Sequence, residues 1–382
     1  MTRFHFETTP RIVCERGAAL RLASLLPCCR RAFVVTDPGL VRAGLVQAPV
    51  DALVEAGLHV TVYDRVEADP PEHVVLAAAQ AARDDGADCV VGLGGGSSLD
   101  TAKLVALLAA TPQPLDAIYG PGRATGPRLR LLQVPTTAGT GSEATPTAVV
   151  STPDHQKRGV ISPLLLPDAA VLDATLTVGL PPAVTAMTGV DAMVHAIEAY
   201  TTRHLKNPLS DALAVRALQL LHANLPRAVA QGDDLDAREA MLLGSLLAGM
   251  AFANAPVAAI HALAHPLGSH FHVPHGLANA LVMLPVLRFN RPVASGRYAE
   301  LARALDPGLR DTPDLRAADA FIDMMAGHLA AAPMAQRLAD VGIAEGDLST
   351  LAAAAMTVQR LLDNNPRLVT EADAHDLYAE AF

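Results

Sequence analysis

The amino-acid sequence predicts an α/β domain built on a parallel sheet, followed by an all-helical domain. Its 382 residues are too many for one ordinary core and suit two domains with a cleft between them. The first half alternates β-rich runs with helical patterns, whereas the second half shows only helical periodicity. The pattern changes at the Gly-Leu-Pro-Pro stretch that begins at residue 179, so we predict domains over residues 1–178 and 179–382.

Five short apolar runs predict the strands of the first domain. They cover residues 31–36, 59–63, 88–93, 129–134 and 169–172. Apolar spacing of helical period over residues 71–85 and 98–110 predicts two of the intervening helices. From residue 183 to the end, only short Gly/Pro turns interrupt the helical patterns, which predicts a domain without strands.

The composition excludes several classes of function. The chain is 51% hydrophobic and 18% charged, which is typical of a well-buried globular enzyme and not of a disordered chain. Its formal net charge is -10, and it has no Lys/Arg cluster of the kind that a nucleic-acid partner requires. The expected partner is therefore a small molecule.

Neither a signal-peptide pattern nor an uninterrupted apolar run of roughly 18 residues appears in the sequence. We therefore expect a cytoplasmic protein that does not enter a membrane. The cysteines, Cys14, Cys28, Cys29 and Cys89, suggest neither a disulfide framework nor a spaced zinc site. We expect them to be reduced structural thiols.

A glycine run follows the predicted strand over residues 88–93 and precedes a helix. Glycines let the backbone approach a pyrophosphate closely, and the free N–H groups and positive dipole of the helix start then bind its charge. Gly94, Gly95, Gly96 and Ser97 are therefore expected to contact phosphate. The spacing is not the common G-x-G-x-x-G fingerprint, and a plain strand-to-helix turn is the alternative, although one glycine would serve for that.

A second polar loop follows the next strand and supplies Thr136, Thr137 and Thr140. Ligands of open parallel sheets bind beyond the carboxyl ends of the strands, so the two loops are expected to face one ligand. Asp37 ends the strand over residues 31–36, where a carboxylate would bind a ribose diol and repel a 2′-phosphate. That position favours NAD over NADP, and a turn-forming Asp before Pro is the alternative.

The second domain contains residues typical of a metal site. Asp191 and His195 lie four residues apart in an apolar helical stretch, hence on one helix face. Burying many imidazoles among alanines and leucines is costly unless they share a cation. Such a stretch supplies His261, His265, His270, His272 and His275. We expect a loop at His270 and His272 and assign them no role, while the absence of cysteine suits Fe(II), Zn, Mn or Ni without choosing among them.

Together these motifs resemble the iron-containing (group III) alcohol dehydrogenase family, almost from end to end. The matching stretches are GGGSSLDTAK, PTTAGTGSE, GVDAMVHAIEAY, AGMAFANAPVAAIHALAHPLGSHFHVPHG and NPR, in the family's order and spacing. The resemblance implies a Rossmann-like dinucleotide-binding domain followed by a helical, metal-binding catalytic domain. It further implies an NAD-dependent oxidoreductase that interconverts a small alcohol and an aldehyde or ketone, uses a divalent metal (Fe²⁺, with Zn²⁺ as the alternative) to polarise the substrate oxygen, and forms a homodimer or higher homo-oligomer.

The resemblance also implies roles for individual residues. The metal ligands would be Asp191, His195, His261 and His275, and His265 would be a non-ligand histidine that relays protons beside the nicotinamide. The cofactor contacts would be Asp37, Gly95, Gly96, Ser97, Asp100, Thr136, Thr137, Thr140, Thr145 and Lys157. Phe252 would line the substrate pocket with Leu361, a position where some members carry a cysteine, so the substrate stays open.

Three other functions fit parts of the sequence. The terminal segments also resemble maleylacetate reductases, metal-independent relatives that typically carry Asn at the position of Asp191, so Asp191 favours metal dependence. A lyase similar to 3-dehydroquinate synthase would share the architecture and both cofactors, but it needs a strongly cationic pocket, and few Lys or Arg residues lie near the histidines. A non-catalytic metal-binding protein would leave the glycine and threonine loops unexplained.

Overall fold

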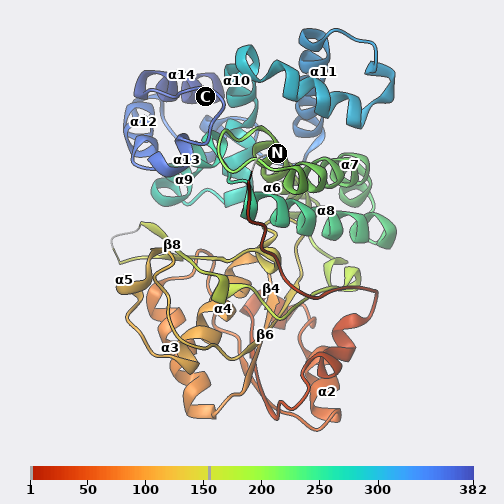
Figure 1. Ribbon diagram of the computed structural model, residues 1–382, viewed down its shortest axis with the longest axis vertical. Helices are drawn as coiled ribbons and strands as arrows, with labels where there is room; N and C mark the ends of the chain where they lie inside the picture. The colour runs from red at the N-terminus through yellow and green to blue at the C-terminus, as the bar shows by residue number, and fades with distance from the viewer. Residues whose placement is uncertain (1–2, 154–155) are drawn as a thin grey trace. The chain divides into compact units, whose positions relative to one another are not determined.

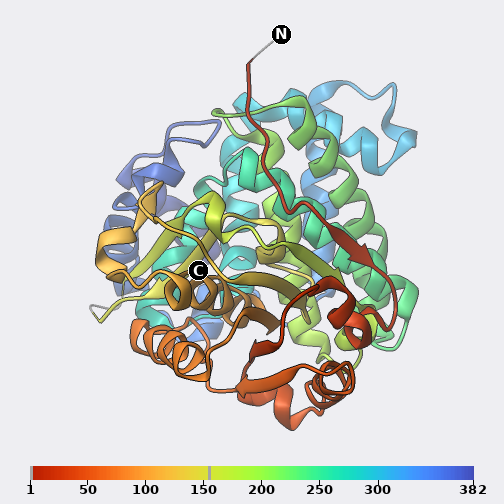
Figure 2. The ribbon, with the colours of Figure 1, turned by 60° about the horizontal axis from the view of Figure 1, so that its bottom comes forward.

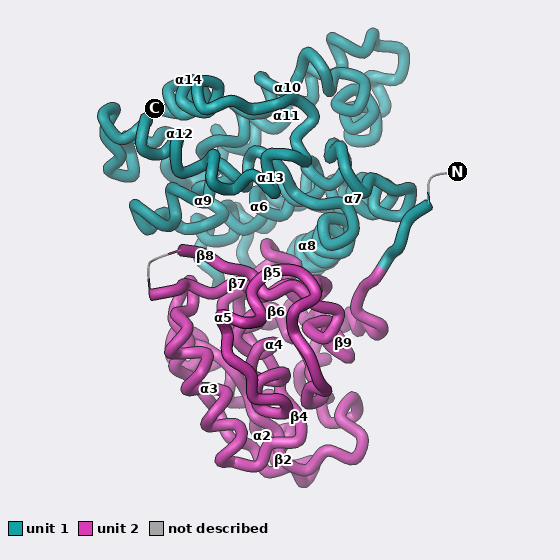
Figure 3. The backbone as a smooth tube through the Cα atoms, turned by 60° about the vertical axis from the view of Figure 1, so that its left-hand side comes forward, with its two compact units in different colours: residues 1–6, 179–382 teal, residues 7–178 magenta. Residues whose placement is uncertain are grey.

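The computed structural model describes residues 3–153 and 156–382 (Figure 1). The chain divides into two compact units (Figure 3). One is Glu7–Val178, and the other is Gly179–Phe382 with the N-terminal stretch that ends at Phe6. The predicted fold class is confirmed, because the first unit is built on a parallel sheet and the second contains only helices among its described residues.

The first unit is organised by a six-stranded sheet with strand order β1-β9-β6-β4-β2-β3, in which every pairing is parallel. Its strands are β1 (Ile12–Cys14), β2 (Arg31–Val35), β3 (His59–Tyr63), β4 (Cys89–Gly94), β6 (Arg130–Pro135) and β9 (Ala169–Leu172). The central strand β4 is buried along its whole length, which explains its continuous apolar run. The sequence analysis missed β1, which is three residues long and partly exposed.

Helices cover both faces of this sheet (Figure 2). On one face, α3 (Glu72–Asp85), α4 (Gly96–Ala110) and α5 (Leu115–Ile118) enclose a core around Val90 and Leu131. On the other face, the 3-10 helix η1 (Ala18–Leu25) and α2 (Gln47–Glu55) enclose a second core around Val34 and Val91. The short helix α1 (Pro38–Arg42) follows β2, and α4 follows β4, so both begin at the carboxyl edge of the sheet.

A small second sheet, ordered β5-β8-β7, completes the first unit. Its strands are β5 (Gly120–Pro121), β7 (Thr147–Ser151) and β8 (Lys157–Ile161), and β7 pairs with β8 antiparallel. The sequence analysis did not predict this sheet. Its strands are at most five residues long, and no Asn-Gly or Asp-Gly signal joins the two that form the hairpin.

The second unit consists of helices joined by short connections. They are α6 (Pro182–Thr201), α7 (Pro208–Ala230), α8 (Leu235–Asn254), α9 (Ala259–Phe271), α10 (His275–Leu305), α11 (Asp314–Ala331), α12 (Leu348–Met356), α13 (Gln359–Leu362) and α14 (Glu371–Ala381). Helix α6 packs against α7, α8 and α10 and is buried over most of its length. Any polar side chain on α6 must therefore find partners inside this unit.

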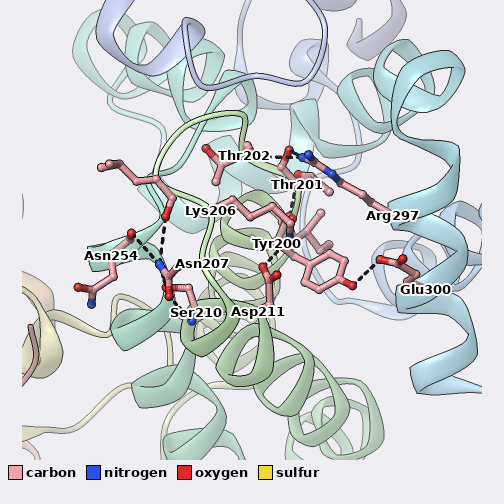
Figure 4. A network of polar contacts seen from close by, with 12 residues as sticks. Tyr200, Thr201, Thr202, Lys206, Asn207, Ser210, Asp211, Asn254, Arg297 and Glu300 are labelled. Atoms are coloured by element: carbon pink, nitrogen blue, oxygen red, sulfur yellow. Dashed lines mark hydrogen bonds and ion pairs between the residues drawn. The ribbon is translucent and has the colours of Figure 1, made fainter. Parts of the chain in front are cut away.

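The carboxyl end of α6 is held by a polar network (Figure 4). Lys206 donates to the Tyr200 carbonyl at 2.6 Å and forms an ion pair with Asp211 at the start of α7. Arg297 of α10 donates to the carbonyls of Thr201 and Thr202. These two cations satisfy carbonyls that the helix leaves open and oppose the negative end of its dipole. They thereby anchor the helix that carries the polar site described below.

Within the described residues, no single helix is both long and apolar enough to cross a membrane. Helices α8 and α9 pass that test only as a pair bent by 105°.

Candidate metal centre

Four side chains from three helices converge inside the helical unit. Helix α6 supplies Asp191 and His195, His261 lies in the first turn of α9, and α10 begins at His275. One ligand atom from each residue lies within 4.8 Å of the others. The first three residues are buried and His275 is partly buried. The structure thus brings together the four predicted ligands, which the sequence separates by up to 84 positions (275 minus 191).

The distances between these side chains are close to those that separate the ligands of one shared ion. Asp191 Oδ1 lies 3.6 Å from His275 Nε2 and 4.0 Å from His195 Nε2. The His261 ring centroid is 4.7 Å from that of His195 and 5.4 Å from that of His275. Phe252 stacks against His195, with ring centroids 4.3 Å apart. This apolar contact restricts the rotation of the His195 ring.

Asn279, one turn after His275 on α10, contacts the same group. Its Nδ2 donates to Asp191 Oδ1 at 2.6 Å and lies 3.3 Å from Nε2 of both His261 and His275. Its Oδ1 is buried and makes no hydrogen bond with the described residues. One carboxylate and three imidazoles gathered at one buried point are a donor set that fits a divalent cation.

The electrostatics of Asp191 agree with that fit. Burial alone would raise the pKa of this carboxyl, but the adjacent His195, His275 and His261 and the hydrogen bond from Asn279 bring it below its usual value. Asp191 therefore supplies a negative charge at neutral pH, and a divalent cation needs one for binding in a buried site.

The remaining predicted residues of this unit lie outside the four-residue group. His265 is partly buried one turn after His261, with its ring centroid 6.4 Å from that of His275. Leu361 is buried in α13, which packs against α9. The loop expected at His270 is wrong, because α9 continues to Phe271. His270 is exposed in the last helical turn, and His272 caps the helix in a left-handed conformation.

The first unit holds a cavity of about 400 Å³ beside the glycine run. Asp37, Gly95, Gly96 and Ser97 line it, and α4 begins there without a capping side chain among the described residues. A Cβ at Gly96 would lie 2.7 Å from Thr140 Cγ2, so close approach to the second loop requires glycine at this position. The unpaired N–H groups of the helix start and the adjacent cavity suit a phosphate.

All three threonines of the second loop lie against the glycine run. A Cβ at Gly95 would meet the Thr137 side chain at 3.6 Å, and Thr140 lies beside Gly96. Thr136 is buried, and its N–H donates to the Gly94 carbonyl at 3.0 Å. The two loops are therefore adjacent, as expected for neighbouring strands.

The position of Asp37 fits both roles considered in the sequence analysis, a turn-forming role and a contact with the cofactor. Its Oδ1 caps α1 by accepting from the N–H groups of Gly39 and Leu40, which is the turn-forming role. Its Oδ2 accepts from Ser98 Oγ at 3.4 Å, and the side chain borders the cavity. A contact with a ligand in this cavity is therefore compatible with the cap.

Asp100 and Thr145 belong to a network around Lys103, which the sequence analysis did not single out. Lys103 is fully buried and donates to Thr145 Oγ1 at 3.0 Å. Asp100 accepts from Ser142 Oγ at 2.6 Å and from the Val149 N–H at 2.9 Å. These contacts join α4 to the loop and strand that follow β6. A lysine in an otherwise apolar helix was the signal available in the sequence.

Lys157 lies on β8 and pairs with Asp69 at 2.7 Å, a second residue that the sequence analysis missed. The Asp69 N–H also donates to Ser97 Oγ at 3.2 Å, so this residue joins Lys157 to the glycine loop. Asp69 has a left-handed backbone, with φ 50. Its signal in the sequence was an Asp-Pro turn after a strand, at the same sheet edge as the two loops.

A second group of possible ligands, Cys29, Asp88 and Cys89, also lies within 4.8 Å. The Asp88 carboxylate already accepts from the N–H groups of Arg30 and Arg31. Burial raises the pKa of both thiols, which disfavours the thiolates that a metal would bind. A structural role agrees better with these contacts.

Comparison with known proteins gives consistent matches over both units. The model described as "Fe-containing alcohol dehydrogenase family, C-terminal" matches residues 185–382, and "Iron-containing alcohol dehydrogenase" matches residues 9–174. The probable alcohol dehydrogenase EutG of Salmonella typhimurium is 41% identical, over 91% of this chain and 87% of that protein. Lactaldehyde reductase of Escherichia coli is 34% identical, over 92% of each chain.

Solved structures agree with these matches. A 1,3-propanediol oxidoreductase superposes with a TM-score of 0.95 at 33% identity, covering 100% of both chains. A sulfoacetaldehyde reductase from Bifidobacterium kashiwanohense, solved in complex with NAD+, gives a TM-score of 0.90 at 29% identity and covers 100% of this chain and 99% of that one.

Proposed function

Because the chain belongs to the iron-containing alcohol dehydrogenase family, we propose that Asp191, His195, His261 and His275 hold the divalent metal of its reaction. The chain is an oxidoreductase that interconverts an alcohol and an aldehyde or ketone, with NAD and a divalent metal as its cofactors. The observation that carries the ligand proposal is the convergence of one carboxylate and three imidazoles within 4.8 Å. We propose Fe²⁺ as the metal, with Zn²⁺ as the alternative that the same donors accept.

When bound, the metal supplies a Lewis acid for the substrate oxygen, and NAD supplies the acceptor for hydride. The protein's part is to orient these groups. Phe252 offers an apolar surface to the substrate beside His195, on which it stacks. His265, partly buried beside His275, carries a proton to or from the reaction. Leu361 borders the substrate in place of the cysteine that some family members carry.

We propose that the dinucleotide binds to the first unit, within the domain predicted over residues 1–178, and that the chemistry takes place on the helical unit, within the domain predicted over residues 179–382. The cavity beside Asp37, Gly95, Gly96 and Ser97 would receive the ribose and pyrophosphate. The other proposed cofactor contacts are the residues of the adjacent loop, Thr136, Thr137 and Thr140, together with Asp100, Thr145 and Lys157. The Asp37 carboxylate, which borders this cavity, supports NAD in preference to NADP, because its negative charge would repel a 2′-phosphate.

Metal dependence is favoured over a maleylacetate reductase-like reaction. Asp191 is a carboxylate within reach of three histidines, and the matched relatives are alcohol, lactaldehyde and propanediol dehydrogenases. A small alcohol or aldehyde is the proposed substrate. We also propose a cytoplasmic location, supported by four free cysteines, and a homodimer or higher homo-oligomer, supported by the family resemblance alone.

The experiment is metal analysis of the purified protein, combined with an NAD-linked assay on short alcohols, diols and aldehydes. His261→Ala and Asp191→Asn should each lose most of the bound metal and lower turnover by roughly 100-fold or more, because the group that polarises the substrate oxygen is no longer held. NADH affinity, measured by the fluorescence of its reduced nicotinamide, should be unchanged, since the proposed cofactor contacts lie in the other unit.

The matched control is His270→Ala, which removes an exposed imidazole from the same helix as His261. It should keep wild-type metal content and activity. His272 is a poorer control because its left-handed backbone disfavours alanine. Full activity of Asp191→Asn, or of chelator-treated protein, on the best substrate would refute the four-ligand site.

A further inference from the structure

Glu198 is a buried carboxylate that contacts one of the four proposed ligands, His261, at the ring nitrogen Nδ1. It lies on α6, three residues after His195, and is 3% exposed. Its Oε2 lies 2.6 Å from His261 Nδ1. The sequence analysis passed over it, although an acidic residue on a buried helix, seven positions after Asp191, was a visible signal.

The other contacts of Glu198 are made with the start of α9. Oε2 accepts from the Ala258 N–H at 2.9 Å, and Oε1 accepts from the Ile260 N–H at 2.7 Å. Helix α9 has no side-chain cap of its own, so a carboxylate from α6 satisfies its first donors and lies at the positive end of its dipole. Three donors thus compensate the burial of this carboxylate.

These contacts fix the tautomer of His261. Both oxygens of Glu198 act as acceptors, so the proton between the two side chains belongs on His261 Nδ1. The lone pair of the imidazole is then on Nε2, which lies 3.3 Å from Asn279 Nδ2 on the side of Asp191 and His275. A histidine can bind a metal only through a nitrogen that carries no proton.

We propose that Glu198 is a positioning residue of the metal centre: it fixes the proton and orientation of His261 and the start of its helix, so that Nε2 faces the other three ligands. Glu198 is not itself a ligand, because its oxygens are occupied by three N–H groups. This inference rests on the proposed function, since it assigns Glu198 a role towards the metal that the four ligands would hold.

The test measures Zn²⁺ affinity of the metal-free protein by competition with a chromophoric chelator, and the absorption spectrum of the Co²⁺-loaded protein. Glu198→Gln keeps the shape but has a single acceptor atom, so its amide N–H₂ must face either His261 Nδ1 or a backbone donor of α9. The first arrangement moves the imidazole proton to Nε2. We expect Zn²⁺ affinity to fall by about 10- to 100-fold and the Co²⁺ spectrum to change.

Asp234→Asn is the matched control, because Asp234 also caps a helix of this unit, α8, by accepting from the Ala237 N–H at 3.0 Å. It makes the same carboxylate-to-amide change at a helix cap without a change at His261, and should leave Zn²⁺ affinity and the Co²⁺ spectrum as in the wild type. If Glu198→Gln does not fold, Glu198→Asp replaces it. Its shorter side chain withdraws the carboxylate from His261, and we expect a smaller loss of affinity.

Failure of this inference and failure of the proposed function give different results. A wild-type protein that binds no Zn²⁺ and no Co²⁺ would overturn the metal site itself. Wild-type binding together with unchanged affinity and spectrum in the folded Glu198 variant would overturn the positioning role and leave Glu198 as a helix cap.

Discussion

Gly276 sets how closely α10 can approach α6 at the point where both carry proposed ligands. A Cβ at this position would lie 2.4 Å from the Met187 carbonyl oxygen and 3.4 Å from Asp191 Cβ. Backbone cannot yield to such a contact without moving a helix. The absence of a side chain at Gly276 therefore allows the His275 imidazole to lie near the Asp191 carboxylate, with His275 Nε2 3.6 Å from Asp191 Oδ1.

Gly276→Ala should consequently weaken both the fold and the metal site. We expect the free energy of unfolding to fall by about 1–3 kcal/mol, because overpacking displaces α10 from α6. Zn²⁺ affinity should fall as well, since His275 moves away from Asp191. Chemical denaturation and chelator competition measure the two effects.

Gly296→Ala provides the control within the same helix, where an added Cβ meets no atom within 4 Å. This variant should keep wild-type Zn²⁺ affinity. Its free energy of unfolding should rise by up to about 1 kcal/mol, because alanine is the better helix former. Equal Zn²⁺ affinity in the two variants would show that close approach at Gly276 does not position the site.

At the level of single residues, the sequence predicted which residue types meet but not how each is held. Spacing could not separate His261 from His265, because both fall on one helix face; the structure separates them through the contact of Glu198 with His261 Nδ1. Asn279 was missed because its contact with Asp191 depends on the packing of α6 against α10, which the sequence does not show. Such information lies in tertiary packing.

At the level of elements, five of the six strands of the main sheet were predictable because they are short runs rich in apolar and β-branched residues, whereas the three-residue β1 was too short to detect. The β7–β8 hairpin was not, because its burial alternates over only five residues per strand. Its register places Ser151 opposite Lys157, and the Lys157 side chain then reaches Asp69. A short hairpin of this kind is specified by its neighbours more than by its own propensity.

Helices α7 and α11 share a histidine pair that should make stability depend on pH. His328 Nε2 lies 2.7 Å from His222 Nδ1. Burial and the neighbouring His222 lower the pKa of His328 from about 6.5 to about 4, and burial also lowers the pKa of His222. Below pH 6.5 the unfolded chain binds a proton that the folded chain refuses. Stability is therefore lost as the pH falls from 6.5 towards 4.

The expected loss from His328 over this window is on the order of 3 kcal/mol. His328→Gln should flatten the dependence between pH 6.5 and 4, because it removes the titrating group and keeps a hydrogen-bonding side chain. Urea denaturation at a series of pH values, in one metal state, measures it. His375→Gln, which removes a partly exposed histidine of α14, is the control and should leave the wild-type slope. An unchanged slope in His328→Gln would contradict the assignment.

At the level of the whole molecule, the two proposed binding functions are assigned to separate units. Asp191, His195, His261 and His275 all lie in Gly179–Phe382, whereas the glycine and threonine loops lie in Glu7–Val178. The sequence indicated this division because the change from alternating to helical periodicity falls between the two sets of motifs. It could not indicate the N-terminal stretch up to Phe6, which groups with the helical unit through contacts distant in sequence.

This division predicts separate protection patterns in hydrogen exchange. Any ligand that binds only the folded protein stabilises it, by about 2.7 kcal/mol at a hundredfold excess over its Kd, and the nearest amides are the most directly protected. Zn²⁺ alone should slow exchange in peptides from α6, α9 and the start of α10. NAD alone should slow exchange in peptides covering the β4–α4 turn and the loop after β6. Peptides from α14 serve as the internal reference. Protection of the glycine loop by Zn²⁺ alone, or none of that loop by NAD, would contradict the assignment of the two sites.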